Sequence, residues 1–91
     1  MQKKRDRLHV IYDILRTIQE KNGNIRPTHI LYKSNLSHKM MAEYLAELIQ
    51  KGFIVESETK NGKTYSLTDK GYDYLAKFRL IIEFQKSFGL D

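Results

Sequence analysis

The stretch from residue 35 to residue 71 constrains the fold most, because it carries a helix start, a hairpin signal and a second helix start in close succession. Ser37 suits a helix N-cap, since its hydroxyl can accept a hydrogen bond from an otherwise unpaired backbone N–H, and Gly52 suits the end of the same helix. The Asn-Gly pair at 61–62 is the strongest short-range signal for a β-hairpin. Thr68 can then cap a further helix. These signals predict a helix, a two-stranded hairpin and another helix, in that order.

Two helices are predicted before this stretch. Apolar residues at helical spacing predict the first over residues 6–21, and the Asn-Gly-Asn sequence at 22–24 ends it. A short second helix is predicted over residues 28–33, because Pro27 is tolerated at the first helical position, where its missing N–H would have no partner. The predicted apolar stripe of the first helix consists of Leu8, Val10, Ile11, Ile14, Leu15 and Ile18, and the expected buried residues of the second are Ile30 and Leu31.

The third helix and the hairpin form the centre of the predicted domain. The helix runs from residue 37 to its stop at Gly52, and strands at residues 53–55 and 64–67 flank a turn at residues 60–63. The predicted apolar face of this helix consists of Met41, Tyr44, Leu45, Leu48 and Ile49.

A last helix is predicted over residues 68–88, with Gly89 as its stop. The complete order is helix, helix, helix, strand, strand, helix. This order is that of an α+β winged helix-turn-helix with an additional C-terminal helix. The length predicts that residues 1–91 form a single domain.

The composition is that of a globular protein, with 41% hydrophobic and 30% charged residues. No apolar segment approaches the roughly 20 residues that a membrane-spanning helix needs, and no apolar segment typical of a signal peptide follows the basic residues 1–7. The absence of cysteine excludes disulfides and thiolate chemistry. We therefore expect a cytoplasmic protein without a membrane partner.

The positive charge lies in the first part of the chain. Residues 1–39 hold nine Lys or Arg against three Asp or Glu, whereas residues 40–91 hold seven against eight. This asymmetry favours an anionic partner, with nucleic acid as the first candidate. The alternative is that the net charge of +5 only keeps a small protein in solution.

The third helix is the expected DNA-contacting element, because the second helix of a helix-turn-helix presents its N-terminal, solvent-facing side to the major groove. Ser37 and the helix N-terminus suit a phosphate, and His38 and Lys39 could reach phosphates or guanine acceptors. The candidate DNA-binding residues are Lys4, Arg5, Arg26, Lys33, Ser37, His38, Lys39, Met40, Ala42, Glu43, Lys60 and Lys63, and a basic arm of Lys3, Lys4, Arg5 and Arg7 extends them. Alternatively, Ser37 only caps a helix, the arm is an uninvolved tail, and Lys60 and Lys63 only prevent pairing between hairpin edges.

Base readout by this helix is expected to be weak. The helix has no arginine and no glutamine before Gln50, although these residues make many of the usual specific contacts to bases. Glu43 and Glu47 are predicted on its outer side, where they would repel phosphate. We therefore expect affinity to come from the DNA backbone and to depend strongly on salt.

The C-terminal helix is predicted to be apolar on two sides. Leu75, Phe78 and Ile82 share the side assigned to the core. On the other side Leu80, Phe84 and Phe88 are spaced four residues apart, and Ile81 lies between the two apolar sides and joins them. A helix that is apolar on both sides has to bury both, so residues 69–88 are predicted to form a homodimer by pairing with a second copy, in an antiparallel arrangement. The alternative is that this helix folds back onto the first helix of its own chain.

No catalytic site or cofactor is expected. His9, His29 and His38 do not have the spacing of metal ligands, and no glycine-rich phosphate loop is present. The sequence therefore predicts neither an enzyme nor a metalloprotein.

Several motifs resemble those of a known group. The sequence ILYKSNLS at residues 30–37, the Lys-Gly pair at 51–52 and LTDKG at residues 67–71 are similar to those of small archaeal winged-helix proteins, which include chromatin-associated DNA-binding proteins. The resemblance covers residues 8–82. It implies DNA binding and dimerisation through an antiparallel coiled coil of C-terminal helices. Because the second apolar face is short here, a compact helix pair is expected instead of a long rod.

Two functions remain open from the sequence. The first is a dimeric DNA-binding protein that acts as a transcriptional regulator or a weakly specific chromatin protein, with duplex DNA as partner. The second is a protein-interaction module on a winged-helix scaffold, because a fold does not fix a function.

Overall fold

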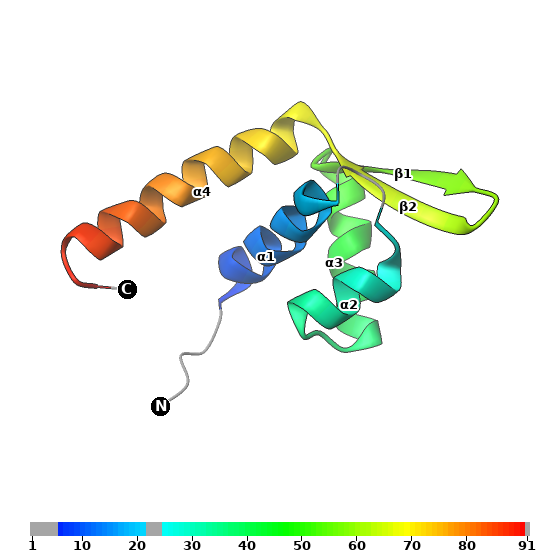
Figure 1. Cartoon of the computed structure of the whole chain (residues 1–91), viewed down its shortest axis with the longest axis horizontal. Coiled ribbons are helices and arrows are strands. Elements are labelled where there is room, and N and C mark those ends of the chain that lie inside the picture. Colours follow the sequence, from blue (N-terminus) through cyan, green and yellow to red (C-terminus); the bar gives the residue numbers. More distant parts are fainter. Residues whose placement is uncertain (1–5, 22–24, 91) are drawn as a thin grey trace.

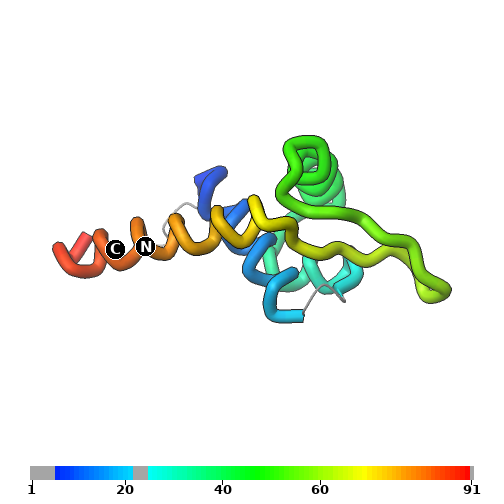
Figure 2. Tube along the Cα trace, turned by 90° about the horizontal axis from the view of Figure 1, so that it is seen from above, coloured from blue at the N-terminus to red at the C-terminus, as the bar shows by residue number. Residues whose placement is uncertain are grey.

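A computed structural model describes residues 6–21 and 25–90 and confirms the predicted element order. The elements are α1 (Arg7–Glu20), α2 (Pro27–Ser34), α3 (His38–Gln50), β1 (Ile54–Thr59), β2 (Gly62–Leu67) and α4 (Asp69–Ser87). The three N-terminal helices form the body, the antiparallel hairpin projects from it as the wing, and α4 extends in the other direction (Figure 1). The view from above shows the same arrangement (Figure 2).

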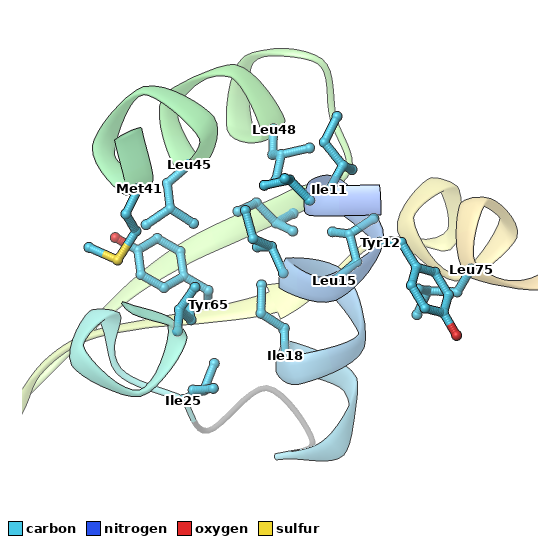
Figure 3. Close-up of a cluster of buried hydrophobic side chains, with 14 of the residues drawn as sticks. Ile11, Tyr12, Leu15, Ile18, Ile25, Met41, Leu45, Leu48, Tyr65 and Leu75 are labelled. Atoms are coloured by element: carbon cyan, nitrogen blue, oxygen red, sulfur yellow. The ribbon is translucent and has the colours of Figure 1, made fainter. Parts of the chain in front are cut away.

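The core lies where α1, α3 and the hairpin meet. Leu15 and Ile18 of α1, Leu48 of α3 and Tyr65 of β2 point toward one another there (Figure 3). Leu15 and Ile18 have no exposed surface, so the face of α1 predicted from helical spacing is buried. Burial of this apolar surface holds the helices and the wing together.

Two residues of the predicted apolar faces are exposed. Leu8 is 51% exposed, because it lies in the first turn of α1 and borders an open groove beside α4. Ile49 is 37% exposed, because it lies about 100° around α3 from the buried Leu48 and so reaches the edge of the packed face.

The wing includes a short pairing that the sequence did not predict. β1 and β2 pair from Ile54 with Leu67 to Thr59 with Gly62, which places the two-residue loop one position before the predicted centre of the turn. Gly62 has a φ of +115°, a value that favours glycine. Ile25 forms an isolated antiparallel bridge with Tyr65 and ties the start of α2 to the wing. A single paired residue gives no alternating pattern from which a strand can be recognised.

The helix α3 ends in a hydrogen-bonded turn that requires glycine. Gly52 has a φ of +82°, its N–H donates to the Ile49 carbonyl at 3.1 Å, and the Phe53 N–H donates to the Leu48 carbonyl at 2.9 Å. This is the Schellman arrangement, which satisfies the last carbonyls of a helix.

The LTDKG motif binds the start of α4 to the end of α3. The Thr68 hydroxyl accepts a hydrogen bond from the Gly71 N–H at 3.2 Å and donates to the Gly52 carbonyl at 2.5 Å. The Lys70 ammonium donates to the Lys51 carbonyl at 2.7 Å. Gly71 packs so closely on the Phe53 carbonyl oxygen that a Cβ there would collide with it. The motif therefore has a structural role at the junction of α3, β1 and α4.

We predict that Gly71→Ala lowers the free energy of unfolding by about 1–3 kcal/mol, because the added methyl group forces α4 away from Phe53. Urea unfolding followed by circular dichroism measures this loss. Tyr72→Ala, at the exposed neighbouring position, is the control and should change the free energy by about 0.5 kcal/mol or less. A Gly71→Ala variant as stable as the parent protein would contradict the proposed close packing.

The first half of α4 packs on α1 and its second half extends beyond the body (Figures 1 and 2). The Tyr12 and Phe78 rings stack with centroids 4.9 Å apart, and the Arg79 guanidinium donates to the Gln19 side-chain oxygen at 3.2 Å. Leu75 and Phe78 are buried, and Ile82 is half-buried, as predicted. Folding back onto α1 therefore covers one side of α4.

Candidate nucleic-acid interface

The turn between α2 and α3 brings four of the candidate residues together. Asn35 adopts the left-handed conformation with a φ of 52°, which ends α2 and redirects the chain into α3. Lys33 before the turn and Ser37, His38 and Lys39 after it are all exposed. A helix-turn-helix places these positions beside the DNA backbone and at the entry to the major groove.

Ser37 caps α3, as predicted. Its hydroxyl oxygen accepts a hydrogen bond from the Met40 N–H at 3.1 Å. The hydroxyl is exposed and keeps its hydrogen for donation to an external acceptor such as a phosphate oxygen. The N-terminus of α3 adds a partial positive charge at the same place. Capping and phosphate binding are therefore compatible at Ser37.

The outer face of α3 carries short or flexible side chains. Ala42, Glu43 and Ala46 are exposed along it, and Met40 is 44% exposed. Two alanines leave room for the helix backbone to approach a flat or grooved surface. Lys39 and Glu43 are oppositely charged, so their charges largely cancel on this face and the positive end of the helix dipole remains.

Glu47 does not lie free on the outer side, contrary to the prediction. Its carboxylate accepts hydrogen bonds from the Lys51 ammonium at 2.8 Å and from the Arg7 guanidinium, and its side chain is only 23% exposed. Arg7, assigned to the basic arm from the sequence, is the first residue of α1 and also lies over the Tyr44 ring. Glu47 therefore binds α1 to α3, and two cations compensate its charge.

These contacts change the acidity of Glu47. Hydrogen bonds from Lys51 and then from Arg7 lower the pKa of Glu47 below its ordinary value of 4.5. A carboxylate whose pKa is lower in the folded state contributes stability above its unfolded pKa and loses that contribution as pH falls through the folded pKa. The hydrogen bond from the backbone N–H of His9, followed by that from its ring, lowers the pKa of Asp6 in the same way.

We predict that Glu47→Gln destabilises the protein at pH 7 and that this difference shrinks as pH falls below about 4.5, the ordinary pKa of glutamate. Unfolding free energies of both proteins, measured in urea at pH 7, 5 and 3, give the difference at each pH. Glu43→Gln, at an exposed position on α3, is the matched control. A difference between Glu47→Gln and the parent that stays constant over this range would show that the ion pairs do not contribute.

The wing tip carries the other candidate lysines. Lys60 lies in the hairpin loop, and Lys63 lies on β2 with its ammonium 3.7 Å from the Glu56 carboxylate. Both are exposed. At the wing base the Tyr65 ring is buried, and this burial together with a hydrogen bond to Glu56 raises the pKa of Tyr65 to about 12. The hairpin is thus fixed to the core at its base and presents lysines at its tip.

The outer face of α2 is a further candidate surface that the sequence did not predict. Tyr32 is 81% exposed, and Thr28 and His29 are exposed beside it. Tyr, Thr and His side chains all donate hydrogen bonds to phosphate oxygens, and the first helix of a helix-turn-helix crosses the DNA backbone. The sequence does contain an indication of this surface, because Tyr32 is not one of the two positions predicted to be buried in α2, which are Ile30 and Leu31.

The remaining candidates lie apart from this group. Arg26 is exposed at the N-cap of α2, next to the Ile25 bridge and hence to the wing base. Lys33 also borders a hollow lined by Asp13 and Glu20. Lys4 and Arg5 lie outside the described residues. The predicted dimer residues Leu80, Ile81, Phe84 and Phe88 are 64%, 50%, 63% and 66% exposed on α4.

Neither a metal site nor a membrane span is found in the part of the chain that the structure describes. No group of three or more His, Cys, Asp or Glu side chains there could hold a metal ion. No helix in residues 6–21 and 25–90 is both long and apolar enough to cross a bilayer.

The three-helix body, the Schellman turn after α3 and the two-stranded wing define a winged helix-turn-helix. A family model described as winged helix-turn-helix matches residues 4–86, and the chain belongs to this family. The family assignment agrees with the expectation that the chain is not an enzyme.

Proteins of archaea and of their viruses are among those similar to this chain. Uncharacterized protein MJ0290 of Methanocaldococcus jannaschii is 37% identical over 82 residues, which cover 86% of this chain and 36% of that protein. The chain thus spans about a third of the length of this relative. Sso10a-2, a DNA-binding protein from Sulfolobus solfataricus, superposes with a TM-score of 0.79 at 20% identity, over 92% of this chain and 85% of that chain. F93 from STIV, a winged-helix DNA-binding protein, gives 0.72 at 21% identity, over 88% and 92%. These likenesses establish the fold and confirm the resemblance to archaeal winged-helix proteins.

Proposed function

We propose that this chain binds duplex DNA through the N-terminal half of α3, the turn before it and the wing. The observation that carries the proposal is the exposed group of Lys33, Ser37, His38 and Lys39 at the start of α3, where a helix N-terminus adds positive potential. The lysines of the wing tip supply a second contact, to the backbone beside the groove. Sso10a-2 and F93, which share this fold, are DNA-binding proteins.

The proposed mode of binding depends on phosphate contacts. Glu47 is compensated by Arg7 and Lys51, so it repels the DNA backbone less than its position in the sequence suggests. The exposed face of α3 nevertheless offers few side chains suited to reading bases, since Ala42 and Ala46 have no polar group. This combination suits a chromatin protein or a regulator with weak sequence preference.

The active unit of this proposal is a homodimer formed through α4. Leu80, Phe84, Phe88 and Leu90 are each more than 60% exposed, and Ile81 is 50% exposed. Apolar side chains grouped on one helix favour a protein contact. A dimer places two copies of α3 and two wings on one DNA molecule, which raises the overall affinity for DNA above that of one chain.

We predict that Lys39→Glu combined with Lys63→Glu weakens binding to a random-sequence duplex at about 50 mM salt and lowers the slope of log affinity against log salt by about 2 for each chain bound, because each chain loses two phosphate contacts. Fluorescence anisotropy of a labelled duplex, titrated at about 50, 100 and 200 mM salt, measures both effects. Sequences of different composition should be affected alike, since phosphate contacts carry no base information.

Lys21→Glu combined with Lys86→Glu is the matched control, because it changes the net charge equally at exposed positions on the C-cap of α1 and the second half of α4. It should keep the original slope. Equal effects of the two double variants would mean that only net charge matters and that the assigned contacts are wrong. Undetectable DNA binding by the parent protein at 50 mM salt would refute the proposed function and favour the protein-interaction module.

We predict that the protein sediments at twice the 10.8 kDa of one chain at micromolar concentration and above. Phe84→Asp, which places a charge in the exposed apolar side of α4, should give a folded monomer, because an unpaired charge disfavours burial in an interface. Sedimentation equilibrium gives the mass, and circular dichroism confirms the fold. A parent protein that stays at 10.8 kDa at every concentration would exclude the dimer.

A further inference from the structure

An apolar groove of about 280 Å³ lies on the side of α4 that faces the start of α1. Leu8 of α1, Phe53 after α3 and Phe78 and Ile81 of α4 contribute apolar surface to it. The Tyr74 hydroxyl donates to the Leu8 carbonyl at 2.8 Å and fixes the two helices beside it. The groove explains why Leu8 is exposed although it belongs to the apolar stripe of α1.

The groove continues into the exposed apolar side of α4. Positions 74, 77, 81, 84 and 88 alternate in spacing between three and four residues, which places them on one line along a helix that packs against another helix. Tyr74 and Ile81 line the groove, and Phe84 and Phe88 continue the line toward the end of α4. Because Ile81 belongs to both, the groove and the exposed stripe form one continuous apolar surface.

We propose that the groove receives Phe88 from a second copy of the chain, so that two α4 helices pair antiparallel about Ile81. This inference rests on the homodimer of the proposed function and adds its register. Phe88 and Tyr74 both lie seven residues from Ile81, so an antiparallel pair centred at Ile81 brings Phe88 of each copy opposite Tyr74 of the other. The arrangement is self-complementary, as a two-fold dimer requires.

The end of α4 suits this insertion. Gly89 has a φ of +70°, and the Leu90 N–H donates to the Gln85 carbonyl at 2.8 Å, so the helix terminates just at Phe88. Phe84 and Phe88 lie with ring centroids 5.1 Å apart and form an aromatic pair at this end. Opposite them, the groove offers Phe53 and Phe78, so aromatic side chains would fill an aromatic-lined space.

The charges at the rim favour an apolar occupant over a small polar ligand. The Lys77 ammonium is 3.0 Å from the Asp73 carboxylate, and the Lys70 ammonium donates to the Lys51 carbonyl. Both cations thus already have partners, and the groove wall is mainly hydrocarbon. An apolar side chain from a second copy matches this lining without leaving a polar group unsatisfied.

The docking would connect the dimer to the DNA-contacting helix. Phe53 follows Gly52 at the end of α3, and the Lys70 ammonium lies 4.5 Å from the centre of its ring. A partner side chain in the groove would therefore touch the residue that fixes the end of α3. Each copy would thus help to orient helix α3 of the other copy.

The test is a double-mutant cycle on the dimer dissociation constant, measured by sedimentation equilibrium. Leu8→Ala and Phe88→Ala should each raise this constant about tenfold, and the double variant should raise it much less than the product of the two, because both remove the same contact. Tyr72→Ala, which truncates a 48% exposed aromatic residue on the opposite face of α4, should change it less than about twofold.

The position of Leu8 separates this register from a simple pairing of α4 helices, since Leu8 lies on α1. A dimer whose dissociation constant is unchanged by Leu8→Ala, or in which the two substitutions act independently, overturns docking in the groove and leaves the dimer itself intact. A parent protein that is monomeric throughout removes the dimer and the groove contact together.

The absence of cysteine allows a second test of the register. Ile81→Cys should form a covalent dimer on mild oxidation, because residue 81 faces its own copy across the two-fold axis. Phe88→Cys alone should not, because the two copies of residue 88 would lie about 21 Å apart along the helix axis. Efficient cross-linking at residue 88 would indicate parallel helices and overturn the proposal.

Discussion

The hydrogen bonds at the end of α3 fix how α3, the wing and α4 are oriented relative to one another. Gly52 changes the direction of the chain after α3, and the Phe53 N–H donates a hydrogen bond to the Leu48 carbonyl. The Phe53 carbonyl then accepts a hydrogen bond from the Thr68 N–H at 3.1 Å, so the residue after Gly52 also fixes the end of the wing. Thr68 and Lys70 donate to the last two carbonyls of the same turn. One short segment thus sets the direction of α3, β1 and α4, and the absence of a side chain at Gly71 permits this close contact.

The element order could be predicted because its determinants are local. Ser37 and Thr68 cap their helices through their own backbone neighbours, and Gly52, Gly62 and Gly89 all take positive φ values. Such signals depend only on nearby residues and can be read from the sequence. The core face of α1 could be predicted equally well, since the spacing of apolar residues along a helix shows which face is buried.

Other features depend on residues that are distant in the sequence. Glu47 looks like an exposed acidic residue until α1 brings Arg7 to it, 40 positions earlier in the chain. The Ile25 bridge requires Tyr65, and the exposure of Leu8 requires the course of α4. For the candidate interface, the sequence supplied the positions on α3 and the wing but not Tyr32, whose exposure depends on how α2 packs. The assignment of the DNA-binding and dimer residues stays a prediction.

The direct connection of the wing to α4 has a geometrical consequence. Thr68 ends the hairpin and begins the helix without an intervening linker, so the position of the wing is tied to the length of α4. In the proposed dimer the two Thr68 residues lie 13 positions on either side of the two-fold axis, or about 39 Å apart at 1.5 Å per residue. In such a dimer the length of α4 would therefore set how far apart the two winged-helix units lie.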